Sequence, residues 1–263
     1  MTRAAKVVLS TVGPFAIHGE LLVERCVENG CSYVDITGET QFIRAMIERH
    51  HDAAVKKKVA IVHCCGYDSV PSDIGALVLV DHMRKSRMSV GHVHHYIGES
   101  NGGFSGGTVA SIVNILATSS SSETRAAMAP NALTPPGARR TTMRDLFWPK
   151  FDALLGKWTT MWLMEGINTR IVRRSAAFVD YGETFGERHV VLNYESVFFF
   201  FSKSVCVCCA EFSEVLAVPN AFVAYLVPLV VIFFVLMIKF PPTRWFLNVR
   251  YVYFNINSKI AKK

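Results

Sequence analysis

The chain has 263 residues, of which 51% are hydrophobic, so it can bury the core of one large or two modest domains and is not a disordered chain. Its net charge is +7, but the last 25 residues alone carry +6 with no acidic residue, which leaves about +1 for the rest. This distribution excludes the basic footprint of a nucleic-acid binder and favours anionic lipid headgroups as the partner of the tail.

The cysteines and the N-terminus indicate a cytosolic chain. The seven cysteines are odd in number and do not form the paired C-x-x-C motifs of a zinc site, which favours reduced thiols over a disulfide framework. Residues 1–12 contain no long apolar stretch that ends in a small-residue cleavage site, so we expect no secretory signal.

The first part of the chain alternates strand and helix patterns. Residues 6–12, KVVLSTV, predict a strand that ends at Gly13-Pro14, and the following residues predict a helix that stops at Gly30. Residues 32–36, SYVDI, predict a second strand, and residues 42–58 predict a helix that ends in three lysines, where cations suit the helix dipole.

A third strand and helix are predicted in residues 59–75, VAIVHCCGYDSVPSDIG. The apolar run from Val59 to Val62 is typical of a strand that is covered on both faces of a parallel sheet. Gly66 ends this run. The polar residues up to Asp73 then suit a loop that leads into a helix, with Pro71 in its first turn.

Three such units in residues 6–85 predict a parallel sheet with right-handed crossovers, which is half of a doubly wound, Rossmann-like domain. We assign residues 1–88 to this domain. Because ligands gather beyond the carboxyl ends of the strands in such sheets, chemistry is expected at residues 66–73. The alternative is that Asp68 and Ser69 merely cap the helix.

The sequence pattern changes near Met88, and we assign residues 89–197 to a second, α+β domain that binds substrate or forms a dimer. His92 and His94 lie two apart on one face of a predicted strand, but no third ligand accompanies them, so we predict no metal site. Residues 101–107, NGGFSGG, indicate a turn before a helix over 108–117, and residues 119–137 indicate a surface loop. The three arginines at 170, 173 and 174 are expected to be solvated, or to meet an acidic substrate.

The last segment, 198–263, predicts a membrane-associating element with a basic tail. Residues 221–238 form an uncharged run of 18, close to the ~20 needed to span a bilayer, and only cationic charges follow it. A buried core helix is the weaker alternative. A single span would place the body outside the cytosol, which conflicts with the unpaired cysteines and the missing signal, so we expect Pro228 to bend the segment into a monotopic hairpin or re-entrant anchor with both ends cytosolic.

Four stretches of the chain resemble the saccharopine dehydrogenase-like oxidoreductases, the group that includes the trans-acting enoyl reductases of bacterial glycolipid synthesis. They are TVGPFAIHGE at 11–20, YVDITGE at 33–39, CGYDSVPSDIG at 65–75 and SGGTVAS at 105–111. The resemblance implies an NAD(P)-binding Rossmann domain, lipid-related substrates, and association with lipid droplets, mitochondria and other membranes. It also allows a homodimer.

The chain departs from the family in one important respect, because it contains no G-x-G-x-x-G motif and starts after the Gly-rich unit that seats the pyrophosphate. Most of the affinity for a dinucleotide should therefore be missing. The residues do not discriminate between NADP and NAD as the cofactor.

We therefore expect an oxidoreductase that acts by NAD(P)-linked hydride transfer on a small-molecule or lipid-linked substrate at a cytosol-facing membrane, lipid monolayer or droplet surface. The alternative is a catalytically silent, membrane-associated binding or scaffold protein. Residues that would hold the cofactor are Thr11, Val12, Gly13, Pro14, Gly66 and Ser69, and those that could donate a proton are Asp68, Tyr67 and His18.

Overall fold

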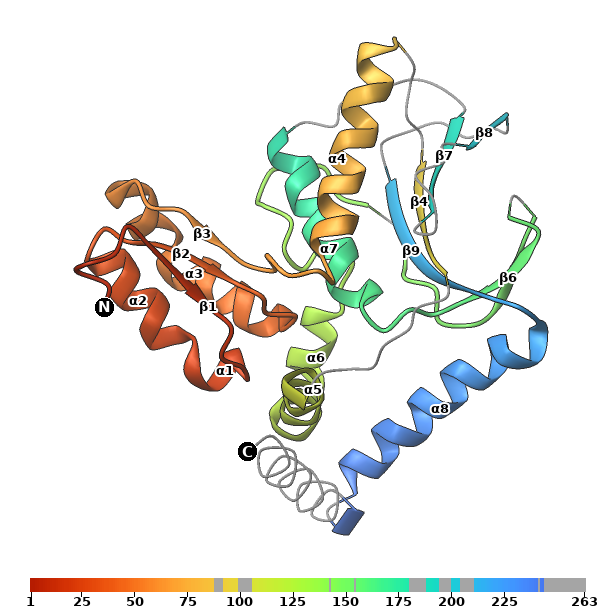
Figure 1. Cartoon of the computed structure of the whole chain (residues 1–263). Coiled ribbons are helices and arrows are strands. Elements are labelled where there is room, and N and C mark those ends of the chain that lie inside the picture. The colour runs from red at the N-terminus through yellow and green to blue at the C-terminus, as the bar shows by residue number, and fades with distance from the viewer. Residues whose placement is uncertain are drawn as a thin grey trace, which may run out of the picture.

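A computed structural model describes residues 1–87, 92–98, 106–141, 143–153, 155–179, 188–193, 200–203, 211–240 and 242–243. These residues form a mixed α/β protein with two sheets and one long apolar helix near the C-terminal end (Figure 1).

The first sheet has three parallel strands in the order β1-β2-β3, which confirms the predicted strand–helix alternation. Its strands are β1 (Val7–Ser10), β2 (Ser32–Asp35) and β3 (Ile61–Val62). The helices between them are α1 (Phe15–His18), α2 (Glu20–Glu28) and α3 (Thr40–Lys57).

Among the described residues, helices cover one face of this sheet. Val8 and Tyr33 are buried in one core with residues of α2 and α3, such as Val23 and Ile43. The opposite face carries exposed apolar side chains: Val7 (55% exposed), Leu9 (66%), Ile36 (47%) and Val62 (46%). The prediction that the third strand is covered on both faces is therefore wrong, and that strand is also shorter than expected.

The helix that follows β3 explains this bare face. Helix α4 (Val70–Lys85) leaves the first sheet, and its apolar side packs with α7 (Glu165–Val179) on the second sheet. Leu79 of α4, Val172 of α7 and Phe212 of the second sheet lie in this shared core. The helix thus joins the two sheets (Figure 1).

The second sheet has six strands in the order β5-β6-β9-β4-β7-β8. These are β4 (His92–Ile97), β5 (Lys150–Asp152), β6 (Lys157–Thr160), β7 (Arg188–Asn193), β8 (Phe200–Lys203) and β9 (Glu211–Val218). β4 runs parallel to both of its neighbours, whereas the other pairs are antiparallel. β9 comes from the segment 198–263, yet it lies between β4 and β6, so this sheet draws on residues beyond 197.

Helices α5 (Gly106–Thr118) and α6 (Ser121–Ala127) follow β4. The first confirms the helix predicted over 108–117. The second lies inside the expected surface loop, where Ser120 and Glu123 form a capping box at its start.

Helix α8 (Ala221–Lys239) is continuous for 19 residues, and Pro228 lies inside it. The expected hairpin at Pro228 is therefore wrong. By length and composition α8 could cross a membrane, and only 17% of its apolar window is buried, which argues against a core helix.

Candidate active site at the carboxyl edge of the first sheet

Three loops leave the same edge of the first sheet, because β1, β2 and β3 are parallel. They comprise residues 11–14, 36–39 and 63–69. The turns at Gly13 and Gly66 therefore lie at the same end of the sheet. In open α/β sheets this carboxyl edge is where ligands bind.

Asp35 holds the second and third loops together. Its Oδ1 atom accepts hydrogen bonds from the amides of Thr37 (3.1 Å) and Cys64 (3.2 Å). Its Oδ2 atom lies 2.7 Å from Nδ1 of His63, and the Asp35 side chain is fully buried. This carboxylate therefore fixes the spacing of the two loops, a role that the sequence analysis did not foresee.

Glu39 joins the second loop to the start of α1. Its carboxylate accepts hydrogen bonds from the amides of Phe15 (2.8 Å) and Ala16 (2.9 Å), and the hydroxyl of Ser111 on α5 donates a third (2.8 Å). Because a carboxylate already binds these amides, this end of α1 does not offer them to a phosphate.

The third loop passes close over the second, and this explains the glycine at position 66. A Cβ atom there would lie only 3.2 Å from Cβ of Ile36. The next two side chains, those of Tyr67 and Asp68, are exposed at the surface. The pKa of Asp68 is raised, mainly because the surrounding protein partly desolvates its carboxyl, and also because of the charge of Glu214.

A buried polar network fastens this third loop to the second sheet. Asn168 of α7 accepts a hydrogen bond from Ser69 Oγ (2.7 Å) and donates to the carbonyl of Asp68 (2.8 Å) and to Glu214 Oε2 (2.7 Å). The other oxygen of Glu214, Oε1, accepts from Ser72 Oγ (2.8 Å). It also lies 2.9 Å from Nδ1 of the buried His95.

The N-terminal end of α7 reaches the same edge. A Cβ atom at Gly38 would lie 3.4 Å from the terminal methyl of Met164, just before the helix. The adjacent Glu165 is almost fully buried and accepts a hydrogen bond from the amide of Leu146. The pKa of Glu165 is raised to about 8, mainly by burial and in smaller part by the nearby charge of Asp145.

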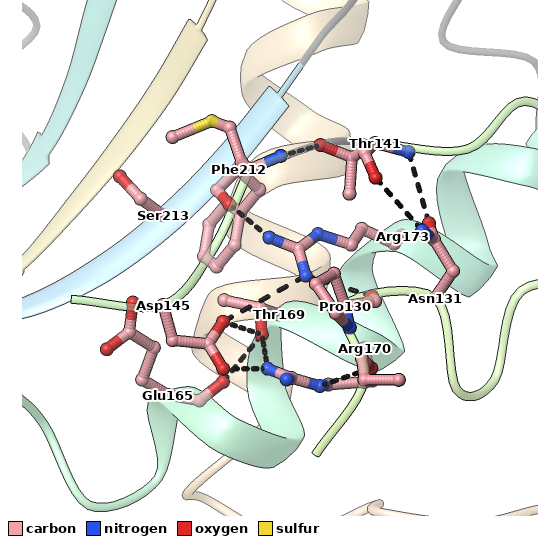
Figure 2. Close-up of polar contacts among 12 residues, drawn as sticks. Pro130, Asn131, Thr141, Asp145, Glu165, Thr169, Arg170, Arg173, Phe212 and Ser213 are labelled. Atoms are coloured by element: carbon pink, nitrogen blue, oxygen red, sulfur yellow. Dashed lines mark hydrogen bonds and ion pairs between the residues drawn. The ribbon is translucent and has the colours of Figure 1, made fainter. Parts of the chain in front are cut away.

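The arginines of α7 donate hydrogen bonds to the protein, and Figure 2 shows two of them, Arg170 and Arg173. The side chain of Arg170 is fully buried and donates to Asp145 and to the carbonyls of Met128 and Ala129. Arg173 and Arg174 donate to the carbonyls of Pro130 (2.9 Å) and Leu133 (2.8 Å). The expectation that these arginines are solvated or meet an acidic substrate is therefore wrong, because they hold the segment 128–133 in place.

The structure brings most of the predicted site residues to one edge. Thr11, Val12, Gly13, Pro14, Gly66, Tyr67 and Asp68 all lie in the loops described above. Ser69 is buried and bonded to Asn168, so its side chain positions α7. His18 ends α1 and is exposed, and no hydrogen bond joins it to Asp68 among the described residues.

No group of three or more metal-ligating side chains occurs in the part of the chain that the structure describes. The rings of His92 and His94 stack at 3.9 Å, and both approach the hydroxyl of Ser213.

Sequence reasoning missed Asn168, Glu214 and His95, which carry the buried network. One signal was available, because Glu214 directly precedes the apolar run VLAV within β9, EFSEVLAV. A charged residue at a buried strand position requires a polar partner.

The fold and this edge define an α/β protein in which three loops meet at the carboxyl ends of parallel strands, the edge where such sheets bind ligands. The chain is 37% identical over 197 residues to a Mycobacterium tuberculosis protein provisionally named a trans-acting enoyl reductase, a match that covers 70% of this chain and 47% of that protein. It is 43% identical over 77 residues to the Homo sapiens saccharopine dehydrogenase-like oxidoreductase (29% of this chain, 18% of that protein). It is also 36% identical over 118 residues to a Caenorhabditis elegans lipid droplet localized protein (43% and 27%).

The matched part of the chain is therefore similar to the saccharopine dehydrogenase-like oxidoreductases and the trans-acting enoyl reductases, as its motifs indicate. The chain spans about half the length of the mycobacterial relative and smaller shares of the other two. No profile of a known protein family and no solved structure matches it.

Replacement of Asn168 by alanine tests the buried network. The change leaves Ser69, the Asp68 carbonyl and Glu214 without their amide partner, and we expect it to cost ~2–4 kcal/mol of the free energy of unfolding. Asn114→Ala on the half-exposed helix α5 is the matched control, with an expected change below ~0.5 kcal/mol. Urea unfolding in non-ionic detergent measures both, and equal costs would contradict the structural role of Asn168.

Glu165 should make the protein less stable at alkaline pH. Because its folded pKa of about 8 lies above the usual 4.5, the folded state holds the proton more tightly, and stability falls as the pH rises from 4.5 through 8. Glu165→Gln should therefore stabilise the protein by ~1–3 kcal/mol at the alkaline end of this range and by much less at the acidic end. Unfolding curves at both ends, with Glu48→Gln on the surface of α3 as control, measure this. A gain that does not depend on pH would refute it.

Proposed function

We propose that this chain is an NAD(P)-linked oxidoreductase that reduces or oxidises a lipid-linked substrate at the surface of a membrane or lipid droplet. The observation that carries the proposal is the meeting of the three family motifs, 11–20, 33–39 and 65–75, at one carboxyl edge. The names of the mycobacterial and human relatives support oxidoreductase chemistry, and that of the nematode relative supports a droplet surface.

The residues at this edge fit one end of a nicotinamide dinucleotide. Each of the three loops contains a glycine without a side chain, at positions 13, 38 and 66. The exposed side chains of Thr11 and Val12 lie in the first of these loops. The diphosphate has no such cradle among the described residues, because Glu39 occupies the amides at the start of α1. We therefore assign the nicotinamide ribose, and not the diphosphate, to these loops.

When bound, a nicotinamide cofactor supplies or accepts the hydride. The chain would supply the proton for the neighbouring substrate atom. Asp68 is the strongest donor, because its side chain is exposed at this edge and its raised pKa means that the carboxyl holds its proton up to a higher pH. The exposed hydroxyl of Tyr67, at 74% exposure for the residue, is the second candidate.

A second candidate function is a catalytically silent protein that binds a membrane and a partner. The carboxylate of Glu39 favours it, because a phosphate cannot share the amides of Phe15 and Ala16 with this group.

Titration with two ligands distinguishes the candidates. We expect NADPH to bind in the micromolar range and reduced nicotinamide mononucleotide, which lacks the adenylate half, to bind within ~10-fold of it, because the edge contacts only the nicotinamide end. Gly13→Val should weaken both, since it adds bulk to this edge. Gly166→Val on α7 is the matched control, because a Cβ atom at either glycine makes only ordinary contacts. Absence of binding by either ligand would favour the scaffold.

A further inference from the structure

Helix α8 presents one continuous apolar stripe to the outside. The stripe consists of Phe222, Leu226, Leu229, Phe233, Leu236 and Phe240. Successive members are four or three residues apart, so they lie on one side of the helix. Each residue is between 44% and 76% exposed. The stripe is therefore a surface that the described protein leaves uncovered along the whole helix.

The opposite side of α8 is packed against the body. Ala224 and Ile238, near the two ends of the helix, are fully buried, and Pro228 between them is buried as well. The hydroxyl of Thr160 on β6 donates to the carbonyl of Ala224 (3.0 Å), and α8 also contacts α5. One side of the helix thus contacts β6, β9 and α5, and Figure 1 shows α8 running from the end of β9 toward α5.

Aromatic residues continue the apolar surface from α8 onto the second sheet. The ring of Tyr225 lies 6.2 Å from that of Trp158, which lies 5.7 Å from the ring of Phe151 on β5. Tyr225 and Phe151 are each 50% exposed. Tyrosine and tryptophan favour the boundary between lipid and water, because their rings are apolar and their tips are polar.

Charge indicates what covers the stripe. The helix itself is uncharged until its last residue, Lys239, and the residues from there to the C-terminus carry +6 and no acidic group. A cationic segment that directly follows an apolar surface complements anionic headgroups above acyl chains.

From these observations we infer that α8 lies in the plane of a lipid surface, with its stripe among the acyl chains of a single leaflet or droplet monolayer and its opposite side on the protein. The inference rests on the lipid-surface part of the proposed function and not on its chemistry. A spanning helix would expose both sides to lipid and would have to separate from β6 and α5.

Flotation with phosphatidylcholine and phosphatidylserine vesicles tests the stripe. We expect the double variant Leu229→Asp/Phe233→Asp to lose at least ~10-fold of the vesicle-bound fraction. The matched control is Ile74→Asp/Val78→Asp on α4, two residues that are also four apart and of similar exposure, and it should float like the unmodified chain. Equal flotation of the two variants would overturn the inference, as would a failure of the unmodified chain to float. Circular dichroism of both variants checks that they fold.

Depth measurements separate an in-plane helix from a spanning one. A fluorescent unnatural amino acid is placed at Phe222, Leu229 or Leu236, and quenching by lipids with shallow or deep spin labels is compared. The in-plane arrangement gives one shallow depth at all three positions. If the fluorophore at position 229 lies much deeper than those at positions 222 and 236, α8 spans the bilayer, and this result overturns the inference.

NADPH binding by the stripe variants in detergent keeps the two proposals apart. If the stripe controls flotation while no nicotinamide binds, the oxidoreductase proposal fails and the lipid inference stands. If nicotinamide binds and the stripe variant floats like the unmodified chain, the lipid inference alone fails.

Discussion

The amide of Asn168 is the contact on which the arrangement of the candidate site depends. It accepts from Ser69, donates to the backbone of the neighbouring residue 68, and donates to the buried carboxylate of Glu214, so it joins α7, the third loop and β9 at one point. A buried carboxylate is costly unless its oxygens have donors, and here Asn168 and Ser72 supply them. The loop that carries Asp68 is thus held by the second sheet as well as by the first.

The same linkage accounts for the unusual first sheet. Parallel sheets are ordinarily covered on both faces, because their crossover helices lie there. Here α4 shares a core with α7 and β9, whereas the core of the first sheet is formed with α1, α2, α3 and the first turns of α7. Among the described residues, the face with Val7, Leu9 and Val62 consequently stays exposed.

The sequence predicts the local elements well, because the spacing of apolar residues and the positions of glycine and proline decide them. The shared edge of Gly13 and Gly66 follows from the strand–helix alternation alone. Long-range partners were not predictable from spacing. Arg170 is typical of a solvated helix face until Asp145 and the carbonyls of residues 128–129 surround it. Pro228 is typical of a bend, yet packing on one side of α8 keeps the helix continuous.

Helix α5 has neighbours on two sides, and this has a practical consequence. Its Ser111 bonds to Glu39 beside the carboxyl edge, and α5 also packs against α8. A shortened chain that ends before α8, made to improve solubility, would remove one of the supports of α5. The loss would then affect Glu39 and the start of α1. Removal of the apolar helix would therefore also loosen the loops at the carboxyl edge of the first sheet.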